Sequence, residues 1–249
     1  MESIKTLFEK IRAAKHCVAL TGAGVSTLSG IRDFRGKNGL YKEMDATKMF
    51  DIDYFEVDPE YYYKTAGSFI YNANEYPASI VHTALAKLEK AGYLKALITQ
   101  NIDFLHQKGG SSRVIEVHGS PAVHYCLYCS GVRTSFEEAA AIVRSGGFPK
   151  CPKCGKILKP AITFFGEALP LEALREAFTE AENCDLMLVL GTSLTVQPAA
   201  GIPDAALRRG AEIVIVNNMP TPLDRYAALK FDELAPVFET ISAMLETAD

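Results

Sequence analysis

The sequence contains no tryptophan, no long apolar run and no excess of basic residues. Its 26 lysines and arginines are outnumbered by 30 aspartates and glutamates, which gives a formal net charge of -4. Without an overall basic surface, non-specific binding to nucleic acid is disfavoured. The stretch from Met1 to Lys5 has no long apolar core, and no later stretch reaches the length of a membrane span. We therefore expect a soluble, cytoplasmic protein with no membrane partner and no direct nucleic-acid binding.

Short apolar runs alternate with amphipathic helical patterns along the 249 residues. Buried strands are predicted at 18–21, 96–99, 114–117, 186–190 and 213–216, and residues 161–164 are expected to rejoin the same sheet. The chain is long enough to bury a sizeable core. The alternation predicts an α/β fold, with a parallel sheet covered by helices on both faces.

Four of the six cysteines form two close pairs, Cys126 with Cys129 and Cys151 with Cys154. Each pair can offer two thiolates to one tetrahedral ion, and two such pairs complete a structural zinc site. Disulfide pairing is the alternative, and a chain without a secretory signal disfavours it. Cys17 and Cys184 stand alone beside apolar strands and are predicted to pack in the core.

Small residues follow the first predicted strand, where Gly22, Ala23 and Gly24 remove side-chain bulk. Such a turn lets backbone N–H groups approach a pyrophosphate, although an ordinary turn has the same appearance and Thr27 replaces the third glycine of the dinucleotide fingerprint. The polar segment 29–36 follows, with Phe34 and Arg35 near its end. It is either a flap that folds over a ligand or a solvated loop.

Polar residues follow several other predicted strands. These are Gln100 to Asp103, His118 with Gly119, Gly191 to Ser193, and Asn217 with Asn218. Ligands bind at the carboxyl ends of strands in doubly wound sheets, so these residues are candidates by position. His118 is placed to act as an acid or a base near neutral pH, and a structural histidine is the alternative.

Aromatic residues are dense between residues 37 and 78. This density predicts the core of a small helical subdomain for most of them, and the lining of an apolar channel is the alternative. Between the cysteine pairs, Ser135 and Glu138 form a capping box that starts a helix ended by Gly146 and Gly147. Residues 124–160 are therefore interpreted as an inserted zinc ribbon.

Taken together, these segments resemble the sirtuins, the NAD-dependent protein lysine deacylases. The match covers nearly the whole chain, and its segments occur in the family's order. It is carried by residues 22–26, 30–35, 99–106, His118-Gly119, the two cysteine pairs, 165–167 and 191–194.

The resemblance implies a Rossmann-like NAD-binding domain and a small domain made of a zinc ribbon and a helical insertion. The large domain would comprise residues 1–36, 79–123 and 161–249, and the small one 37–78 and 124–160. NAD and an acyl-lysine protein or peptide would meet between them, and one structural zinc would be held by Cys126, Cys129, Cys151 and Cys154. A monomer is also implied.

The resemblance further implies roles for individual residues. His118 would be the general base, Gln100 would contact a ribose, and Ile102 and Asp103 would hold the nicotinamide carboxamide. The catalytic set is then His118 and Asn101. The cofactor-binding set is Gly22, Ala23, Gly24, Ser26, Thr27, Phe34, Arg35, Gln100, Asn101, Ile102, Asp103, His118, Gly191, Thr192, Ser193, Asn217 and Asn218. The substrate-binding set is Phe34, Phe50, Thr163, Phe164, Phe165 and Gly166.

The implied reaction is NAD-dependent deacylation that releases nicotinamide, free lysine and O-acyl-ADP-ribose. Two departures stand out: Arg32 replaces the family's usual proline, and Thr163 its usual valine. Residues 61–66 lack the arginine of the desuccinylating branch, which favours an acetyl or another uncharged acyl group. The alternatives are ADP-ribosyl transfer or NAD hydrolysis from the same site, and a non-enzymatic zinc-ribbon module. The adenine contact near Asp232 to Leu234 is left open.

Overall fold

The structure is a computed structural model that describes residues 2–33, 46–67, 70–72 and 75–247. Phe34 and Arg35, both predicted site residues, lie outside the described residues. The elements in chain order are α1 (Glu2–Ala13), β1 (Cys17–Thr21), α2 (Gly24–Thr27), α3 (Ala46–Met49), α4 (Ile52–Val57), α5 (Pro59–Ala66), α6 (Ile80–Lys90), β2 (Leu94–Thr99), α7 (Leu105–Lys108), β3 (Val114–Glu116), β4 (Gly119–Tyr125), β5 (Arg133–Ser135), α8 (Phe136–Arg144), β6 (Lys159–Ile162), α9 (Leu171–Asn183), β7 (Leu186–Leu190), α10 (Gly201–Arg208), β8 (Glu212–Val216), η3 (Asp224–Tyr226), β9 (Ala227–Phe231) and α11 (Leu234–Glu246).

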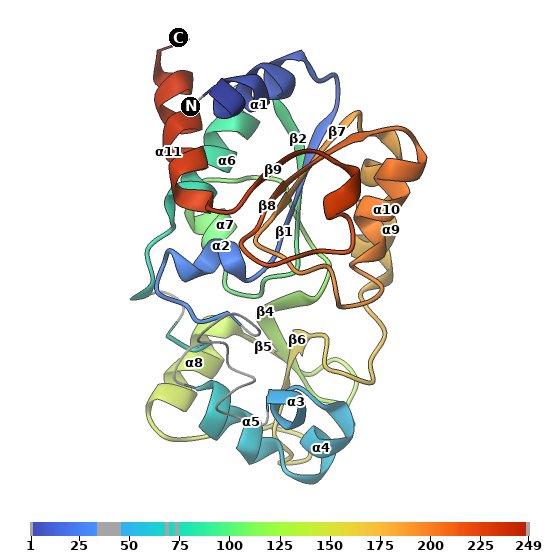
Figure 1. Cartoon of the computed structure of the whole chain (residues 1–249). Coiled ribbons are helices and arrows are strands. Elements are labelled where there is room, and N and C mark those ends of the chain that lie inside the picture. Colours follow the sequence, from blue (N-terminus) through green and yellow to red (C-terminus); the bar gives the residue numbers. More distant parts are fainter. Residues whose placement is uncertain (1, 34–45, 68–69, 73–74, 248–249) are drawn as a thin grey trace.

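A six-stranded parallel sheet forms the larger lobe, in the order β3-β2-β1-β7-β8-β9 (Figure 1). From β1 the chain builds outward through β2 to β3, and it later returns to the other side of β1 to build β7, β8 and β9. The direction of building therefore reverses between β1 and β7. This confirms the predicted doubly wound parallel sheet, whose ligand crevice lies at such a reversal.

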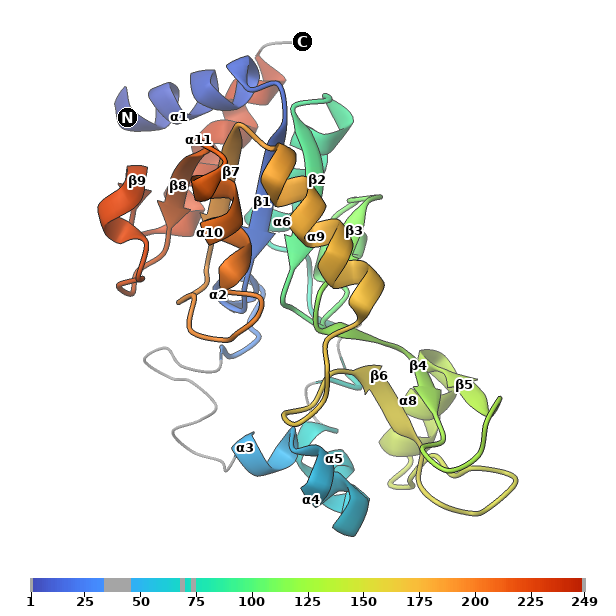
Figure 2. The same ribbon diagram turned by 90° about the vertical axis from the view of Figure 1, so that its right-hand side faces the viewer.

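Helices cover both faces of this sheet because its strands are apolar on both sides (Figure 2). On β7 every residue is buried, and alternate residues enter opposite cores. Leu188 packs with α1, α6 and α11 on one face. Val189 packs with α9 and α10 on the other.

Among the longer elements of the larger lobe, α9 and β9 were not predicted from the sequence, and neither were the short helices α2, α7 and η3. The residues of β9 alternate between half-buried and exposed, because it lies at the edge of the sheet and pairs only with β8 among the described strands. It therefore lacks the continuous apolar run that marks the inner strands.

The smaller lobe contains a three-stranded antiparallel sheet in the order β5-β4-β6. The expectation that residues 161–164 rejoin the parallel sheet is wrong, because β6 pairs with β4 in this second sheet. A short apolar run shows that a strand forms and does not show which strand is its partner. The predicted boundaries between two domains stay a prediction.

The aromatic residues of the helical insertion pack into a core of their own with α8. Its buried members include Phe55, Tyr62, Tyr63 and Tyr71 together with Phe136 and Phe164. The Tyr62 and Tyr63 rings meet edge to face, with centroids 5.0 Å apart. This agrees with the interpretation of the region as the core of a small helical subdomain.

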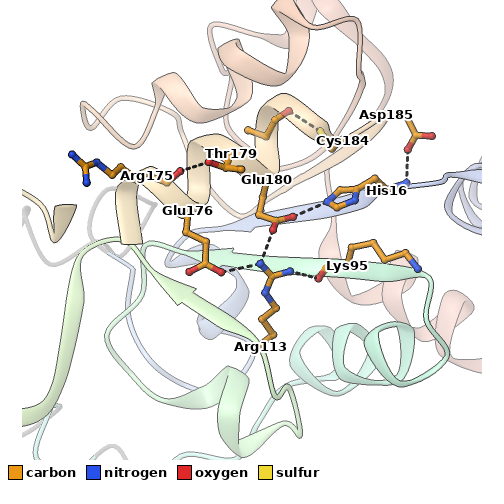
Figure 3. A network of polar contacts seen from close by, with 10 residues as sticks. His16, Lys95, Arg113, Arg175, Glu176, Thr179, Glu180, Cys184 and Asp185 are labelled. Carbon is orange, nitrogen blue, oxygen red and sulfur yellow. Dashed lines mark hydrogen bonds and ion pairs between the residues drawn. The ribbon is translucent and has the colours of Figure 1, made fainter. Parts of the chain in front are cut away.

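A polar network ties the amino-terminal ends of the strands to α9 (Figure 3). His16 Nε2 lies 2.6 Å from Glu180 Oε2, and Arg113 Nη2 contacts both Glu180 and Glu176. His16 precedes β1, Arg113 precedes β3, and Asp185, which accepts the His16 N–H, precedes β7. The network therefore fixes the edge of the sheet opposite to the strand ends that carry the candidate site.

No helix within the described part of the chain is long and apolar enough to cross a membrane.

The central position of β7 predicts a large difference between two otherwise identical substitutions. Val189 is 0% exposed and Val57 is 82% exposed. Val189→Ala removes two buried methyl groups and leaves a cavity, so it should lower the free energy of unfolding by about 2–3 kcal/mol, whereas Val57→Ala should change it by less than about 0.5 kcal/mol. Urea unfolding of both variants measures the difference, and equal stabilities would contradict this account of the core.

Candidate active site

A cavity of about 810 Å³ lies at the carboxyl ends of the parallel strands, where the sheet reverses direction between β1 and β7. Its lining comes from the loops that follow β1, β2, β7 and β8, and from the segment after β6. The segment that follows β9, Asp232 to Pro236, completes one end. The cavity therefore touches both the large sheet and the chain that leaves the small one.

Two loops cross in close backbone contact at the floor of the cavity. Gly24 N–H donates to Gly191 O at 2.9 Å, and Gly22 N–H donates to Leu190 O at 3.0 Å. A Cβ on Gly24 would lie 2.7 Å from Gly191 Cα, and one on Gly22 would lie 2.7 Å from Thr192 Cβ. Gly191 also has a φ of +60°. Side chains are thus excluded where these two strand ends meet, and backbone is left to face a ligand.

The polar residues after β2 are bonded to this crossing. Asn101 Nδ2 lies 3.1 Å from both Gly22 O and Ser26 Oγ. Ser26 Oγ in turn donates to Asp103 Oδ2 at 2.6 Å, and the Leu105 N–H donates to Asp103 Oδ1. Burial raises the pKa of Asp103, and these two hydrogen bonds oppose the shift. The Asn101 amide and the Asp103 carboxyl are therefore held in fixed orientations.

Phe104 stands directly after Asp103 in a left-handed backbone conformation, with φ of 61°. A bulky residue rarely adopts this region, which costs about 1–3 kcal/mol when surrounding structure enforces it. The Phe104 ring packs edge-on against Phe136 of α8, with centroids 5.1 Å apart. The turn that presents Asp103 is thus anchored in the smaller lobe.

His118 lies two residues after β3 of the large sheet and directly precedes Gly119, the residue that opens β4. Its Nδ1 lies 2.8 Å from Gln100 O, and its own carbonyl accepts the Thr163 N–H at 2.8 Å. A carbonyl can only accept, so Nδ1 carries the proton and Nε2 keeps its lone pair. Burial lowers the pKa of His118, and the bond to Gln100 opposes that shift. At neutral pH the ring is therefore a neutral base.

A turn after β6 forms the opposite wall of the cavity. Phe165 N–H donates to Phe50 O at 2.6 Å, and Ile52 N–H donates to Phe165 O at 3.1 Å, so this turn pairs with the start of α4. The Phe165 side chain is 40% exposed, whereas Phe164 is only 1% exposed and packs in the aromatic core. Phe164 therefore lines the cavity from within that core.

The structure brings together every described residue of the predicted cofactor, catalytic and substrate sets at this one cavity. The lining includes Gly22, Ala23, Gly24, Ser26, Thr27, Phe50, Gln100, Asn101, Ile102, Asp103, His118, Thr163, Phe164, Phe165, Gly166, Gly191, Thr192, Ser193, Asn217 and Asn218. Their individual roles stay predictions. Arg32 and Asp33 also line the cavity, ahead of the segment that is not described.

Two parts of the lining were not assigned from the sequence: Ala168, Leu169, Leu171 and Leu174 were missed, and the segment 232–236 was left open. The last of these follows β9, and recognising that strand would have placed it at a carboxyl end. The first leads into α9, which was not predicted either.

The four cysteines of the two sequence pairs converge on one another, and none of them lines this cavity. Their sulfur atoms all lie within 4.8 Å of one another, and Cys126 Sγ is 3.7 Å from Cys154 Sγ. Two thiolates at about 2.3 Å from a tetrahedral zinc ion lie about 3.8 Å apart. The donor set therefore fits zinc, and four thiolates leave no open position for catalysis. Cys17 and Cys184 are buried and unpaired, as predicted.

The residues that line the large cavity also fit the NAD that is expected there. The glycine crossing is a cradle that a Cβ would fill, and the cavity is lined by amide, hydroxyl and backbone groups at the ends of parallel strands. These features fit a dinucleotide.

A doubly wound parallel sheet with a ligand cavity at its reversal, joined to a four-cysteine ribbon, defines an α/β nucleotide-binding protein with a small zinc domain. The family model described as "Sir2 family" matches residues 22–198. This chain belongs to the Sir2 family.

Curated relatives agree with this assignment. The chain is 44% identical over 229 residues to an NAD-dependent protein deacetylase of Thermotoga maritima, with 92% of each chain covered. It is 45% identical over 210 residues to an NAD-dependent protein deacylase of Thermococcus kodakarensis, covering 82% of this chain and 80% of that one. Among solved structures, Sir2 with a p53 peptide and NAD+ matches with a TM-score of 0.87 at 40% identity, and Sir2Tm with a propionylated peptide with 0.86 at 38%; each covers 98% of both chains.

The cysteine cluster predicts one zinc ion per chain. Cys151→Ser removes a thiolate from the set and should reduce the zinc content from about one ion per chain to near zero. Cys184→Ser changes a cysteine of the large-sheet core and should leave the zinc content unchanged. Elemental analysis of both purified variants tests the assignment, and zinc retained at full stoichiometry in Cys151→Ser would contradict it.

Buried histidines predict a loss of stability in acid. Burial lowers the pKa of His82 to about 4. Below about pH 6.5 the histidine is protonated in the unfolded chain but stays neutral in the folded one. The free energy of unfolding therefore falls as the pH drops from about 6.5 towards 4. At pH 5 this single shift is worth about 2 kcal/mol.

His82→Gln tests this contribution of His82 to the loss of stability in acid, because glutamine does not titrate and can keep the hydrogen bond of the histidine. His82 accepts the Ser79 N–H as part of the capping box of α6, and glutamine is the usual residue at that position. The variant should lose about 2 kcal/mol less stability than the wild type between pH 7.5 and pH 5. Urea unfolding at both pH values measures this, and parallel losses would refute the role of His82.

Proposed function

We propose that this protein is an NAD-dependent protein lysine deacylase that releases nicotinamide, free lysine and O-acyl-ADP-ribose. Membership of the Sir2 family and relatives named NAD-dependent protein deacetylase or deacylase support the proposal. The observation that carries it is the position of His118. This neutral base is bonded to Gln100 on the side of the glycine crossing and to Thr163 on the side of the turn after β6.

The two ends of the cavity suit the two halves of the reaction. Asn101, Ser26 and Asp103 are fixed at one end and are proposed to orient the nicotinamide carboxamide and its ribose. Thr192, Ser193, Asn217 and Asn218 line the cavity beyond the crossing and are proposed to contact the adenosine half. When bound, NAD supplies the ribose carbon from which nicotinamide leaves and a ribose hydroxyl that takes the acyl group.

His118 is proposed to act on that hydroxyl through Nε2. With Nδ1–H committed to Gln100 O, Nε2 is the ring atom left to accept a proton. Because burial lowers the pKa of His118, the base is already unprotonated at neutral pH. The bond to Gln100 keeps the ring oriented as the proton moves onto Nε2 and the ring becomes a cation.

The acyl-lysine is proposed to enter beside Phe50 and Phe165, with the peptide pairing as a strand between residues 164–167 and 192–197. Phe165 already uses its N–H and carbonyl towards α4, so the peptide would bond to the neighbouring Gly166 and the carbonyl of Thr163. Phe50, Ile70 and Phe164 give the acyl end of the cavity an apolar lining. An acetyl or another uncharged acyl group fits such a lining because a charged one would be desolvated there.

Four further points stay predictions from the sequence: the cytoplasmic location, the monomeric state, the absence of nucleic-acid binding and the boundaries of the two domains.

Nicotinamide release from NAD by the purified protein, with and without an acetyl-lysine peptide, tests the proposed function. Release should require the peptide and should yield deacetylated peptide in equal amount. His118→Ala should lower turnover about 10²–10⁴-fold, the range for loss of a general base. His16→Ala, at the opposite edge of the sheet, should leave turnover within about twofold.

The pH profile gives a second readout. Because the pKa of His118 is lowered, the acid limb of the kcat/KM profile should have its midpoint on the acid side of the ordinary histidine value of about 6.5. Nicotinamide release that proceeds equally without peptide would instead indicate NAD hydrolysis or ADP-ribosyl transfer.

A further inference from the structure

A charged residue, Lys159, is buried beneath the turn that forms the substrate wall of the cavity. Its side chain is 1% exposed, and it opens β6 at the junction of the small sheet and the aromatic core. Lys159 Nζ donates to Ile162 O at 2.7 Å and to Pro160 O at 3.3 Å, and it lies 2.7 Å from Glu167 Oε2. The ammonium group thus joins the end of β6 to the far end of the turn.

Glu167 links Lys159 to the backbone of the turn. The oxygen that meets Lys159 also accepts the Phe164 N–H at 2.8 Å. In return, the Glu167 N–H donates to Phe164 O at 3.0 Å, which closes residues 164–167 into a turn. Lys159 Nζ also lies 4.1 Å from the centroid of the Phe164 ring. One cation therefore contacts the strand, the ring and the carboxylate that shape the turn.

Stability alone does not explain an ion pair in which the lysine is 1% exposed and the glutamate only 21% exposed. Desolvation of two charges offsets much of their attraction, and apolar residues of similar volume often replace such pairs without loss. The neighbouring side chains, Phe164, Ile162 and Tyr62, already form a continuous apolar core. What the lysine adds is a fixed geometry. Its ammonium group bonds to Pro160 O and Ile162 O on the strand and to Glu167 Oε2 on the turn, and so holds the strand and the turn in one relative position.

We propose that Lys159 is a positioning residue for the peptide substrate, acting through Glu167 to hold residues 164–167 in the shape that receives the acyl-lysine segment. This rests on the proposed function. The glycine crossing and the loops after β2 and β7, where NAD is expected, make none of the contacts described for Lys159. The effect should therefore fall on peptide binding and spare NAD.

Lys159→Met tests the proposal, because methionine has an unbranched side chain of nearly the same length as lysine and carries no charge. Binding of a fluorescein-labelled acetyl-lysine peptide, followed by anisotropy, should weaken about tenfold, or about 1.4 kcal/mol. The KM for peptide should rise in parallel, while the KM for NAD stays within about twofold. Lys64→Met removes an exposed lysine that forms a 2.8 Å ion pair with Glu60, and it should bind peptide as the wild type does.

A second variant separates positioning from damage to the fold. Glu167→Ala should weaken peptide binding to a similar extent, and the double variant Lys159→Met/Glu167→Ala should bind no more weakly than either single variant, because both act through one connection. Zinc content and melting temperature check that each protein is folded. If Lys159 only stabilised the fold, the substitutions would lower kcat and the folded fraction of the protein and would leave the KM for peptide unchanged.

The outcomes are distinct. Wild-type peptide affinity in folded Lys159→Met, additive losses in the double variant, or an equal rise in both KM values would each overturn the positioning role. If the wild-type protein itself neither binds nor deacylates any acyl-lysine peptide, the proposed function fails instead.

Discussion

The structure depends on the close crossing of two backbone segments, at Gly22 to Gly24 and at Gly191. This contact occurs where the parallel sheet reverses its direction of building, so it fixes the distance between the ends of β1 and β7. A side chain on either segment would force the strand ends apart. Asn101 Nδ2 donates to Gly22 O, and Gln100 Nε2 donates to Thr192 Oγ1. The same crossing therefore also holds the side chains of Gln100 and Asn101 in place.

The candidate site keeps its base neutral without a carboxylate partner. In many histidine-dependent enzymes an acidic residue orients the ring and stabilises its charged form. Here the orienting group is the carbonyl of Gln100, and burial favours the neutral ring. The carboxyl of Asp103 is bonded to Ser26 and to the backbone of Leu105 instead. The two titratable groups thus have separate hydrogen-bond networks, which suits a base that starts free and a carboxyl that orients.

The sequence was informative where local pattern and position coincide. Apolar runs followed by glycine or amide residues located β1, β2, β7 and β8 and the polar residues at their ends, because the parallel fold brings such ends to one edge. The pattern failed at β6, whose four residues do not specify a partner strand, and at β9, whose edge position removes the apolar run. Lys159 gave no signal, because a lysine in sequence is normally exposed and only the packing around Phe164 and Glu167 buries it.

The proposed base lies where the chain first passes from the large sheet to the small one. Val117 N–H bonds to Thr99 O beside β2, and Gly119 pairs with Ile162 in the small sheet, so His118 is the point where the chain leaves one lobe for the other. Its ring is bonded to Gln100, on the side of the large sheet. The wall that carries Phe165 is held from the other side, because Phe165 pairs with Phe50 and Ile52 at the start of α4. The orientation of the ring is therefore set by the large sheet, and the position of the substrate wall by the smaller lobe.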